Sequence, residues 1–288
     1  MGDAACTIET HRASDGYVWH YRRYIPPSGA RARAHVVILH GIQSHGGWYE
    51  YSCTRLAEAG FAVSFLDRRG SGLNQEARGD TPSLRRLADD IAEFLSAPGP
   101  IPFPPSPTFL VGISWGAKLA VALPCSRPVV IDGVALLCPG FFPRIGKKWG
   151  VFLLELLGSL RPKRRFPIPL NDPGLFTESP RWQEFLRNDP LALHDATARF
   201  LAASIKLDRY LRFVPEHFTL PTLLLLAEKD RIIDNAATRR FVGYFVATDK
   251  EIIEYPGAHH TLEFEPEPDQ FVRDMIAWLG MRCPRPSE

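Results

Sequence analysis

The chain has few cysteines, little net charge and no long apolar run. Its five cysteines are scattered without paired spacing, which argues against a disulfide framework or a zinc knuckle and favours a reducing compartment. The formal net charge of +2 is too small for a surface that binds nucleic acid. No run could span a bilayer, and the N-terminus lacks the features of a secretory signal. We therefore expect a cytoplasmic protein without a nucleic-acid partner.

A repeating pattern of short apolar runs predicts a parallel sheet. Each run is followed by a glycine-containing turn and a segment with helical periodicity, and the runs are continuously apolar, as in strands covered on both faces. Two edge strands are expected first, around Thr7 to Thr10 and Val18 to Ile25. The strands expected after them are His35 to Leu39, Ala62 to Leu66, Thr108 to Val111, Gly133 to Cys138, Thr222 to Ala227 and Glu251 to Tyr255.

Helix signals and a long interruption divide the chain. One amphipathic helix is expected to begin after Thr81, with Pro82 at its first position, and the last helix to end at Gly280. The proline-rich segment 98–107 predicts a stiff connector. Residues 141–221 separate two expected strands by far more than a normal crossover. We therefore expect an α/β core from residues 1–140 and 222–288, and an inserted helical cap from residues 141–221.

A candidate nucleophile lies between an expected strand and an expected helix. Gly112-Ile113-Ser114-Trp115-Gly116 follows the strand that starts at Thr108 and precedes the helical run Ala117 to Leu123. The two glycines permit a sharp strand-to-helix turn that presents the Ser114 hydroxyl at the carboxyl edge of the sheet. The five-residue pattern alone is weak evidence, but this context predicts a nucleophilic serine.

A serine hydroxyl becomes a good nucleophile only when a histidine takes its proton and a carboxylate orients that histidine. Asp230 follows the strand Thr222 to Ala227 and is the favoured acid, while Asp234 is the alternative and is also explained as a helix cap. His259 and His260 follow the last strand, and spacing alone does not choose between them. A metal site is not expected because no third ligand is suggested near the two histidines.

The same chemistry requires two backbone N–H groups directed at the developing oxyanion. Trp115, which follows the serine, is the first candidate donor, and Ile42, in the His-Gly turn after the strand His35 to Leu39, is the second. His40 is expected to have a structural role in this turn, bonding its backbone rather than transferring protons.

The ordered motifs HGIQSHGGWY, DRRGSG, GISWGAK, EKDRIID and GAHHTLEFE resemble the monoglyceride lipase and lysophospholipase branch of the α/β-hydrolase family. The resemblance implies an α/β-hydrolase fold and a Ser114, His260 and Asp230 triad. It selects His260 over His259 because the family motif is similar to Gly-x-x-His, and it implies that Ile42 and Trp115 are the oxyanion donors.

Two features complicate the family comparison. The family has an acidic residue before the second histidine of its His-Gly loop, but this chain has Ser44 there, which leaves the leaving-group pocket open. The sequence Gly-Ile-Ser-Trp-Gly also resembles the corresponding turn of proline iminopeptidases, although HGIQSH does not match their Gly-Gly-Pro loop. A proline iminopeptidase-like aminopeptidase is therefore the second expectation.

The expected cap contains an apolar helical run with basic flanks. Seven Lys and Arg residues surround this run, against the single acid Glu155. They are Arg144, Lys147, Lys148, Arg161, Lys163, Arg164 and Arg165. Such a helix could contact an anionic membrane peripherally or could instead be buried with a solvated basic turn. Both interpretations favour a lipophilic acyl substrate.

These observations predict a serine hydrolase that cleaves carboxylic esters of lipophilic acyl groups through an acyl-enzyme. The expected substrate is a small-molecule ester or a lipid, and no metal or organic cofactor is expected. Besides the aminopeptidase, the remaining alternative is a noncatalytic α/β-hydrolase homologue that binds lipid without turnover.

Overall fold

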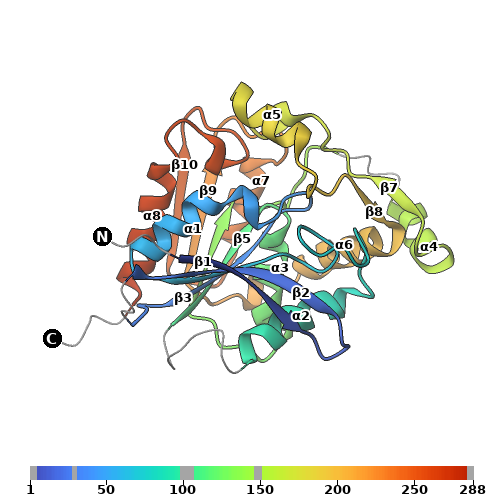
Figure 1. Cartoon of the computed structure of the whole chain (residues 1–288), viewed down its shortest axis with the longest axis horizontal. Helices are drawn as coiled ribbons and strands as arrows, with labels where there is room; N and C mark the ends of the chain where they lie inside the picture. Colours follow the sequence, from blue (N-terminus) through green and yellow to red (C-terminus); the bar gives the residue numbers. More distant parts are fainter. Residues whose placement is uncertain (1–4, 28–30, 98–106, 146–150, 284–288) are drawn as a thin grey trace.

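A computed structural model describes residues 5–27, 31–97, 107–145 and 151–283. Its central feature is an eight-stranded sheet in the order β1-β2-β4-β3-β5-β6-β9-β10 (Figure 1). Strand pairing is antiparallel from β1 to β4 and parallel from β4 to β10. The strands are β1 (Ala5–Arg12), β2 (Val18–Ile25), β3 (His35–Leu39), β4 (Ala62–Leu66), β5 (Thr108–Ile113), β6 (Gly133–Leu137), β9 (Thr222–Ala227) and β10 (Lys250–Tyr255). The expected α/β-hydrolase type of sheet is therefore confirmed.

Helices cover this sheet. On one side α1 packs against β4 and α8, and on the other α3 packs against β5, α2 and α6 (Figure 1). The helices that follow core strands are α1 (Glu50–Glu58), α2 (Leu84–Ser96), α3 (Gly116–Ser126), α7 (Asn235–Gly243) and α8 (Asp269–Met281). Apart from Thr108 at the start of β5, the central strands β3 to β6 and β9 are buried along their whole length, which explains their continuous apolar sequence.

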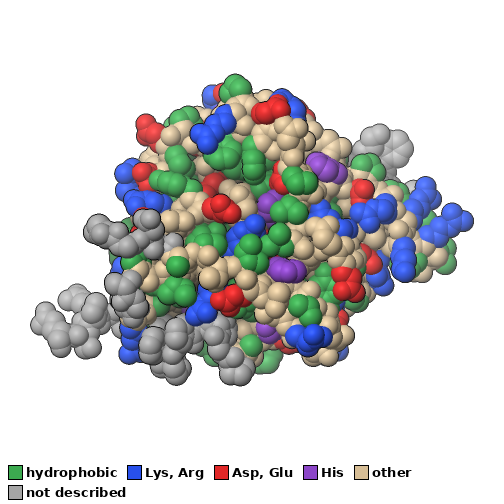
Figure 2. Space-filling model, viewed as in Figure 1, with side chains coloured by type: hydrophobic (Ala, Val, Ile, Leu, Met, Phe, Trp, Pro, Cys, Tyr) green, Lys and Arg blue, Asp and Glu red, His purple; other side chains and the backbone are tan. Residues whose placement is uncertain are grey.

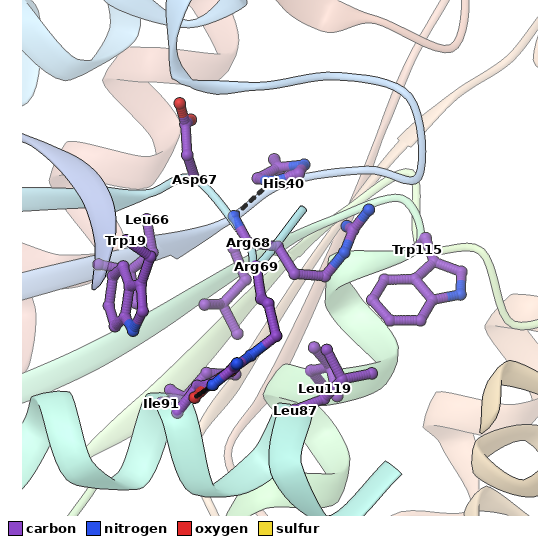
Figure 3. Close-up of a pocket in the computed structure, with 12 residues that line it drawn as sticks. Trp19, His40, Leu66, Asp67, Arg68, Arg69, Leu87, Ile91, Trp115 and Leu119 are labelled. Carbon is purple, nitrogen blue, oxygen red and sulfur yellow. Dashed lines mark hydrogen bonds and ion pairs between the residues drawn. The ribbon is translucent and has the colours of Figure 1, made fainter. Parts of the chain in front are cut away.

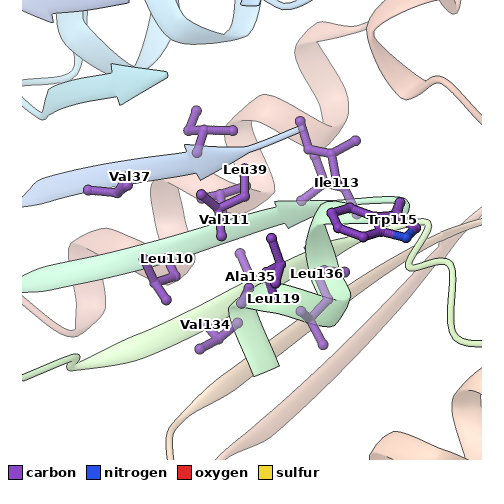
Figure 4. Packing of buried hydrophobic residues seen from close by; sticks show 14 of the residues in the cluster. Val37, Leu39, Leu110, Val111, Ile113, Trp115, Leu119, Val134, Ala135 and Leu136 are labelled. Carbon is purple, nitrogen blue, oxygen red and sulfur yellow. The ribbon is translucent and has the colours of Figure 1, made fainter. Parts of the chain in front are cut away.

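Part of the hydrophobic core lies directly beneath the expected nucleophile turn. Side chains from β3, β5 and β6 meet those of α3 there, including Val111, Leu119 and Leu136 (Figure 4). Val111 is 1% exposed and Leu136 is fully buried. Close packing on both sides of β5 gives the turn at its end a rigid support.

The elements between β6 and β9 lie in the expected insertion. They are α4 (Val151–Leu160), β7 (Arg165–Pro167), α5 (Pro180–Asn188), β8 (Asp195–Thr197) and α6 (Ala198–Leu211), with short 3-10 helices η4 (Pro173–Leu175) and η5 (Pro215–His217). Strands β7 and β8 form a separate antiparallel pair, and α4 packs against α6. Because α6 also contacts α2 and α3, this segment is connected to the core by packing as well as by the chain.

Three local predictions were wrong. Strand β2 is not an edge strand because it pairs with β4 as well as β1. Helix α2 does not begin at Pro82: Ser83 is its N-cap and accepts a hydrogen bond from the Arg86 amide at 3.0 Å. Helix α8 continues through Gly280 to Met281, because Gly280 has none of the positive φ that ends a helix. Residues 98–106 of the proline-rich segment lie outside the described residues, as do Lys147 and Lys148 of the expected basic flank.

Candidate active site

Ser114 occupies a strained turn between β5 and α3. Its φ of +50° is in the left-handed region, which residues other than glycine rarely adopt. The flanking glycines are required by close packing: a Cβ on Gly112 would lie 2.4 Å from Ala117 Cα, and one on Gly116 would lie 2.2 Å from the Leu39 carbonyl oxygen. The turn therefore brings α3 against β3 and β5 with the serine at its apex.

Ser114, His260 and Asp230 form one hydrogen-bonded chain. Ser114 Oγ lies 2.9 Å from His260 Nε2, and His260 Nδ1 lies 2.7 Å from Asp230 Oδ2. An ionised carboxylate can only accept, so His260 carries its proton on Nδ1 and can accept the Ser114 proton at Nε2. The arrangement allows proton transfer away from the serine hydroxyl.

The surroundings of Asp230 keep it ionised. Burial opposes the charge, but the interaction with His260 and hydrogen bonds from two backbone amides outweigh burial and lower the pKa of Asp230. Those amides are of Ile232 and Ile233, at 2.8 and 3.0 Å from Oδ1. Both carboxylate oxygens therefore have defined partners, and Oδ2 is directed at the imidazole.

The two alternative residues have other contacts. Asp234 is the N-cap of α7 and accepts a hydrogen bond from the Ala237 amide at 2.9 Å, which lowers the pKa of this exposed carboxyl. His259 Nδ1 lies 3.1 Å from Glu265 Oε1. The structure thus brings Asp230, and not Asp234, together with His260, and not His259, to the serine.

The His-Gly turn after β3 abuts the nucleophile. A Cβ on Gly41 would lie 3.3 Å from Ser114 Cβ. Within the described ranges, neither the Ile42 amide nor the Trp115 amide donates a hydrogen bond, so both donors are available for an oxyanion. His40 bonds the turn as expected: Nδ1 lies 2.7 Å from the Gly41 carbonyl oxygen and Nε2 accepts from the Arg68 amide at 2.8 Å.

A buried contact that the sequence did not indicate connects this turn to the 141–221 segment. Asp189 Oδ2 accepts hydrogen bonds from His45 Nε2 at 2.9 Å and from Trp48 Nε1 at 2.5 Å. Burial opposes ionisation of Asp189, but these donors lower its pKa. In addition, the Leu193 amide donates to the Gln43 carbonyl oxygen at 2.9 Å. No local signal could have paired residues so distant in the sequence.

A cavity of about 260 Å³ lies between the His-Gly turn and this segment. Its lining includes Gln43 and Trp48 from the turn, and Phe176 and Leu186 from the segment. Phe176 also packs edge-on against His260, with ring centroids 6.0 Å apart. Phe176 therefore contacts both the cavity and the histidine of the candidate triad.

One group of side chains near the triad has the composition of a metal site. Ligand atoms of Cys138, Asp230 and His260 lie within 4.8 Å of one another. However, both oxygens of Asp230 and both ring nitrogens of His260 already have hydrogen-bond partners. Burial raises the pKa of the Cys138 thiol well above its usual value, which disfavours the thiolate that binds metal. The protein therefore favours the metal-free arrangement of these three side chains.

Comparisons with known proteins place this chain in a family. Residues 30–267 match the family described as serine aminopeptidase, S33. The chain is 27% identical to the monoacylglycerol lipase of Mycolicibacterium smegmatis, over 86% of this chain and 88% of that protein. It is 24% identical to the monoglyceride lipase of Rattus norvegicus, over 91% of this chain and 89% of that protein.

Solved structures have the same fold. The crystal structure of Paleococcus ferrophilus monoacylglycerol lipase matches with a TM-score of 0.79 and 25% identity, over 95% of this chain and 99% of that one. A soluble variant of monoglyceride lipase from Saccharomyces cerevisiae matches with a TM-score of 0.84 and 20% identity, over 99% and 97%. The expected resemblance, fold class and serine ester hydrolase class are thus confirmed. The chain belongs to the serine aminopeptidase S33 family and is an α/β hydrolase similar to monoglyceride lipases.

Proposed function

We propose that this protein hydrolyses carboxylic esters of lipophilic acyl groups, as a monoacylglycerol lipase, lysophospholipase or carboxylesterase. The observation that carries the proposal is the hydrogen-bonded chain from Ser114 through His260 to Asp230. The names of two relatives support the substrate class: the monoacylglycerol lipase of Mycolicibacterium smegmatis and a phospholipase of Bacillus subtilis that is 23% identical to this chain.

The proposed reaction has two acyl-transfer steps. Ser114 Oγ attacks the ester carbonyl carbon while His260 Nε2 takes its proton, and Asp230 stabilises the resulting imidazolium. Collapse of the tetrahedral intermediate breaks the bond to the alcohol, which leaves with the proton from His260. Water then attacks the acyl-enzyme, again losing a proton to His260, and the carboxylic acid and free serine are released. The amides of Ile42 and Trp115 hold the oxyanion in both steps.

Residues 141–221 are proposed to form the cap over this site. The Trp115 indole donates to Ser204 Oγ of α6 at 2.8 Å, and Phe176 packs on His260, so residues of this segment contact both sides of the candidate triad. Aromatic and aliphatic side chains here suit an acyl chain better than a charged peptide.

We also propose that α4 contacts anionic membranes peripherally. Helix α4 packs against α6 on one side. Two of its leucines are nevertheless exposed to solvent, Leu156 to 44% and Leu160 to 69%. Exposed Lys and Arg side chains gather at the same end of the molecule, where α4 and β7 lie (Figure 2). Apolar and basic side chains together suit a surface of acidic lipids. Among the described helices, none is both long and apolar enough to cross a bilayer.

The hydrolase proposal is tested by labelling and by an ester series. A fluorophosphonate probe should label the native protein and not Ser114→Ala, and p-nitrophenyl esters should be cleaved only by the protein with Ser114. Turnover is expected to rise with acyl length over the short and medium esters. Equal labelling of both proteins would reject Ser114, and ligand binding without any hydrolysis would favour the noncatalytic homologue.

The family description favours a second candidate, a serine aminopeptidase. Aminoacyl p-nitroanilides, including that of proline, distinguish it from an esterase. We expect cleavage of the esters and no measurable cleavage of the anilides, and the reverse result would assign the aminopeptidase.

Membrane contact is tested by sedimentation with vesicles. Vesicles containing phosphatidylserine should bind the protein, and pure phosphatidylcholine vesicles should not. The double variant Lys163→Glu/Arg164→Glu should lose binding, while a matched charge reversal of exposed Arg85 and Lys229, remote in sequence from α4, should keep it. Wild-type binding by Lys163→Glu/Arg164→Glu, or an equal loss in both double variants, would exclude the basic turn after α4 as the contact. The cytoplasmic location stays a prediction.

A further inference from the structure

Arg68 contacts the loop that carries the candidate oxyanion donor at several points. Its backbone amide donates to His40 Nε2 at 2.8 Å. Its guanidinium donates to the carbonyl oxygens of Gly41, at 3.3 Å from Nη1, and of Ile42, at 3.1 Å from Nη2. His40 Nδ1 lies 2.7 Å from the same Gly41 oxygen. One residue of the turn after β4 therefore holds the backbone on both sides of Ile42.

These contacts determine the direction of the Ile42 N–H. The Gly41 carbonyl and the Ile42 N–H belong to one trans peptide unit, in which the two groups point in opposite directions. Because His40 and Arg68 hold the carbonyl, the N–H is directed away from them. Gly41 itself packs against Ser114, so this orientation is fixed next to the nucleophile.

Arg68 also contacts the residue that carries the second donor. Its guanidinium carbon lies 4.8 Å from the centre of the Trp115 ring and 5.0 Å from that of Phe200. Figure 3 shows the Arg68 side chain extending from beside His40 toward Trp115. Nη2 donates further to Ser71 Oγ at 2.8 Å. Five partners thus fix the position of this cation.

The charge of Arg68 is not neutralised by an ion pair. Among the residues that the structure describes, no carboxylate pairs with its guanidinium, whereas the adjacent Arg69 pairs with Asp15 and Asp90. Burial lowers the pKa of Arg68 to about 9, which leaves it a cation at neutral pH. A partly buried cation that pairs with none of the described carboxylates is unfavourable in the resting protein, and it becomes favourable when negative charge forms nearby.

We propose that Arg68 is a positioning residue for the oxyanion hole, holding the Ile42 amide in its donating direction and supplying positive charge beside the tetrahedral intermediate. The inference rests on the proposed function, since it requires an oxyanion formed by attack of Ser114. Arg68 is expected to stabilise the transition state and not the bound ester, because the negative charge forms only after the ester has bound.

The test compares Arg68→Met and Arg68→Lys with a matched control, Arg69→Met. The measurements are kcat and KM for p-nitrophenyl butyrate, the inhibition constant of an alkyl trifluoromethyl ketone, which forms a charged hemiketal with a serine, and the thermal unfolding midpoint. Arg68→Met should lower kcat by about tenfold to a hundredfold, with KM within about twofold. The ketone should bind more weakly by a similar factor.

The other two variants separate this effect from loss of structure. Arg68→Lys should show a smaller loss of kcat, because one ammonium keeps the charge but cannot bridge two carbonyl oxygens as a guanidinium does. Arg69→Met should lower the unfolding midpoint and keep kcat and ketone affinity. If Arg68→Met does not fold, Arg68→Lys with reduced kcat and unchanged KM supports the proposal.

Three results would overturn it. The first is a wild-type kcat in Arg68→Met, or in Arg68→Lys if Arg68→Met does not fold, and the second is a raised KM with unchanged kcat. The third is an equal loss of kcat and of ketone affinity in Arg68→Met and Arg69→Met. Ser114→Ala distinguishes these from failure of the proposed function. Turnover that survives in Ser114→Ala would reject both proposals, whereas turnover lost in Ser114→Ala and unchanged in Arg68→Met would reject this inference alone.

Discussion

Asp230 Oδ2 lies 2.7 Å from His260 Nδ1, while Oδ1 of the same carboxylate accepts the amides of Ile232 and Ile233. The loop after β9 therefore fixes the orientation of the Asp230 carboxylate independently of its contact with His260. An asparagine could keep the amide contacts, but its NH₂ group could favour the wrong tautomer of the imidazole.

Asp230→Asn should therefore lower kcat for an ester by about a thousandfold to ten-thousandfold, with little change in the unfolding midpoint. Asp234→Asn should retain kcat, since Asp234 is an N-cap and asparagine is a good cap as well. Steady-state kinetics and thermal unfolding of both variants check this. A large loss of kcat in Asp234→Asn with kcat retained in Asp230→Asn would identify Asp234 as the acid.

Ser114 should be replaceable by glycine with a gain in stability, because its φ of +50° is strained for any side chain. We expect the free energy of unfolding of Ser114→Gly to exceed that of Ser114→Ala by about 1 kcal/mol. Urea unfolding measures the difference. Ser159, within α4, is the control: glycine there should be less stable than alanine by about 1 kcal/mol. The same order at both positions would contradict strain at Ser114.

Asp189→Ala should destabilise the protein by about 3 kcal/mol, because it leaves the buried donors of His45 and Trp48 without an acceptor. Removal of the exposed carboxylate of Asp172, which bonds the Gly174 amide, should have an effect of about 1 kcal/mol or less. Denaturant unfolding of the two alanine variants checks this. Similar losses would mean that the buried contact contributes no more than a surface cap.

Glu263 should make stability fall as the pH rises. Burial raises its pKa from 4.5 to about 7, and the Ser52 amide at 3.0 Å offsets this only in part. Between these two pH values the folded chain binds a proton that the unfolded chain has lost, so the free energy of unfolding decreases as pH increases. The contribution is on the order of 3 kcal/mol.

Glu263→Gln should remove that part of the pH dependence and be more stable than the wild type at pH 8, when both are compared by urea unfolding at pH 5 and pH 8. The exposed Glu267→Gln should keep the wild-type pH dependence. An unchanged slope in Glu263→Gln would show that another group is responsible.

Most of the sheet could be predicted because its strands are buried on both faces and therefore continuously apolar. The order of strands in the sheet was not foreseen for β2, which lies between β1 and β4 rather than at the edge. The other two errors were at helix boundaries, where two signals competed. Thr81-Pro82 is a good start for a helix, yet Ser83 makes the cap hydrogen bond, and Gly280 can end a helix but equally adopts helical angles. Local sequence does not decide between such close alternatives.

The candidate triad could be predicted in part. Asp230 was favoured because it follows a core strand closely, but the choice of His260 over His259 depended on the family resemblance, since a loop can present either residue. The roles of these residues and of Ile42 and Trp115 stay predictions until variants are measured. The contacts of Asp189 and Arg68 could not be foreseen, because they depend on packing between segments remote in the chain.

The attachment of Asp189 to His45 joins positions 144 residues apart. Together with the bond from the Leu193 amide to the Gln43 carbonyl oxygen, it anchors the later part of residues 141–221 to the His-Gly turn. The geometry of that turn is therefore complete only once residues far downstream in the chain have folded against it.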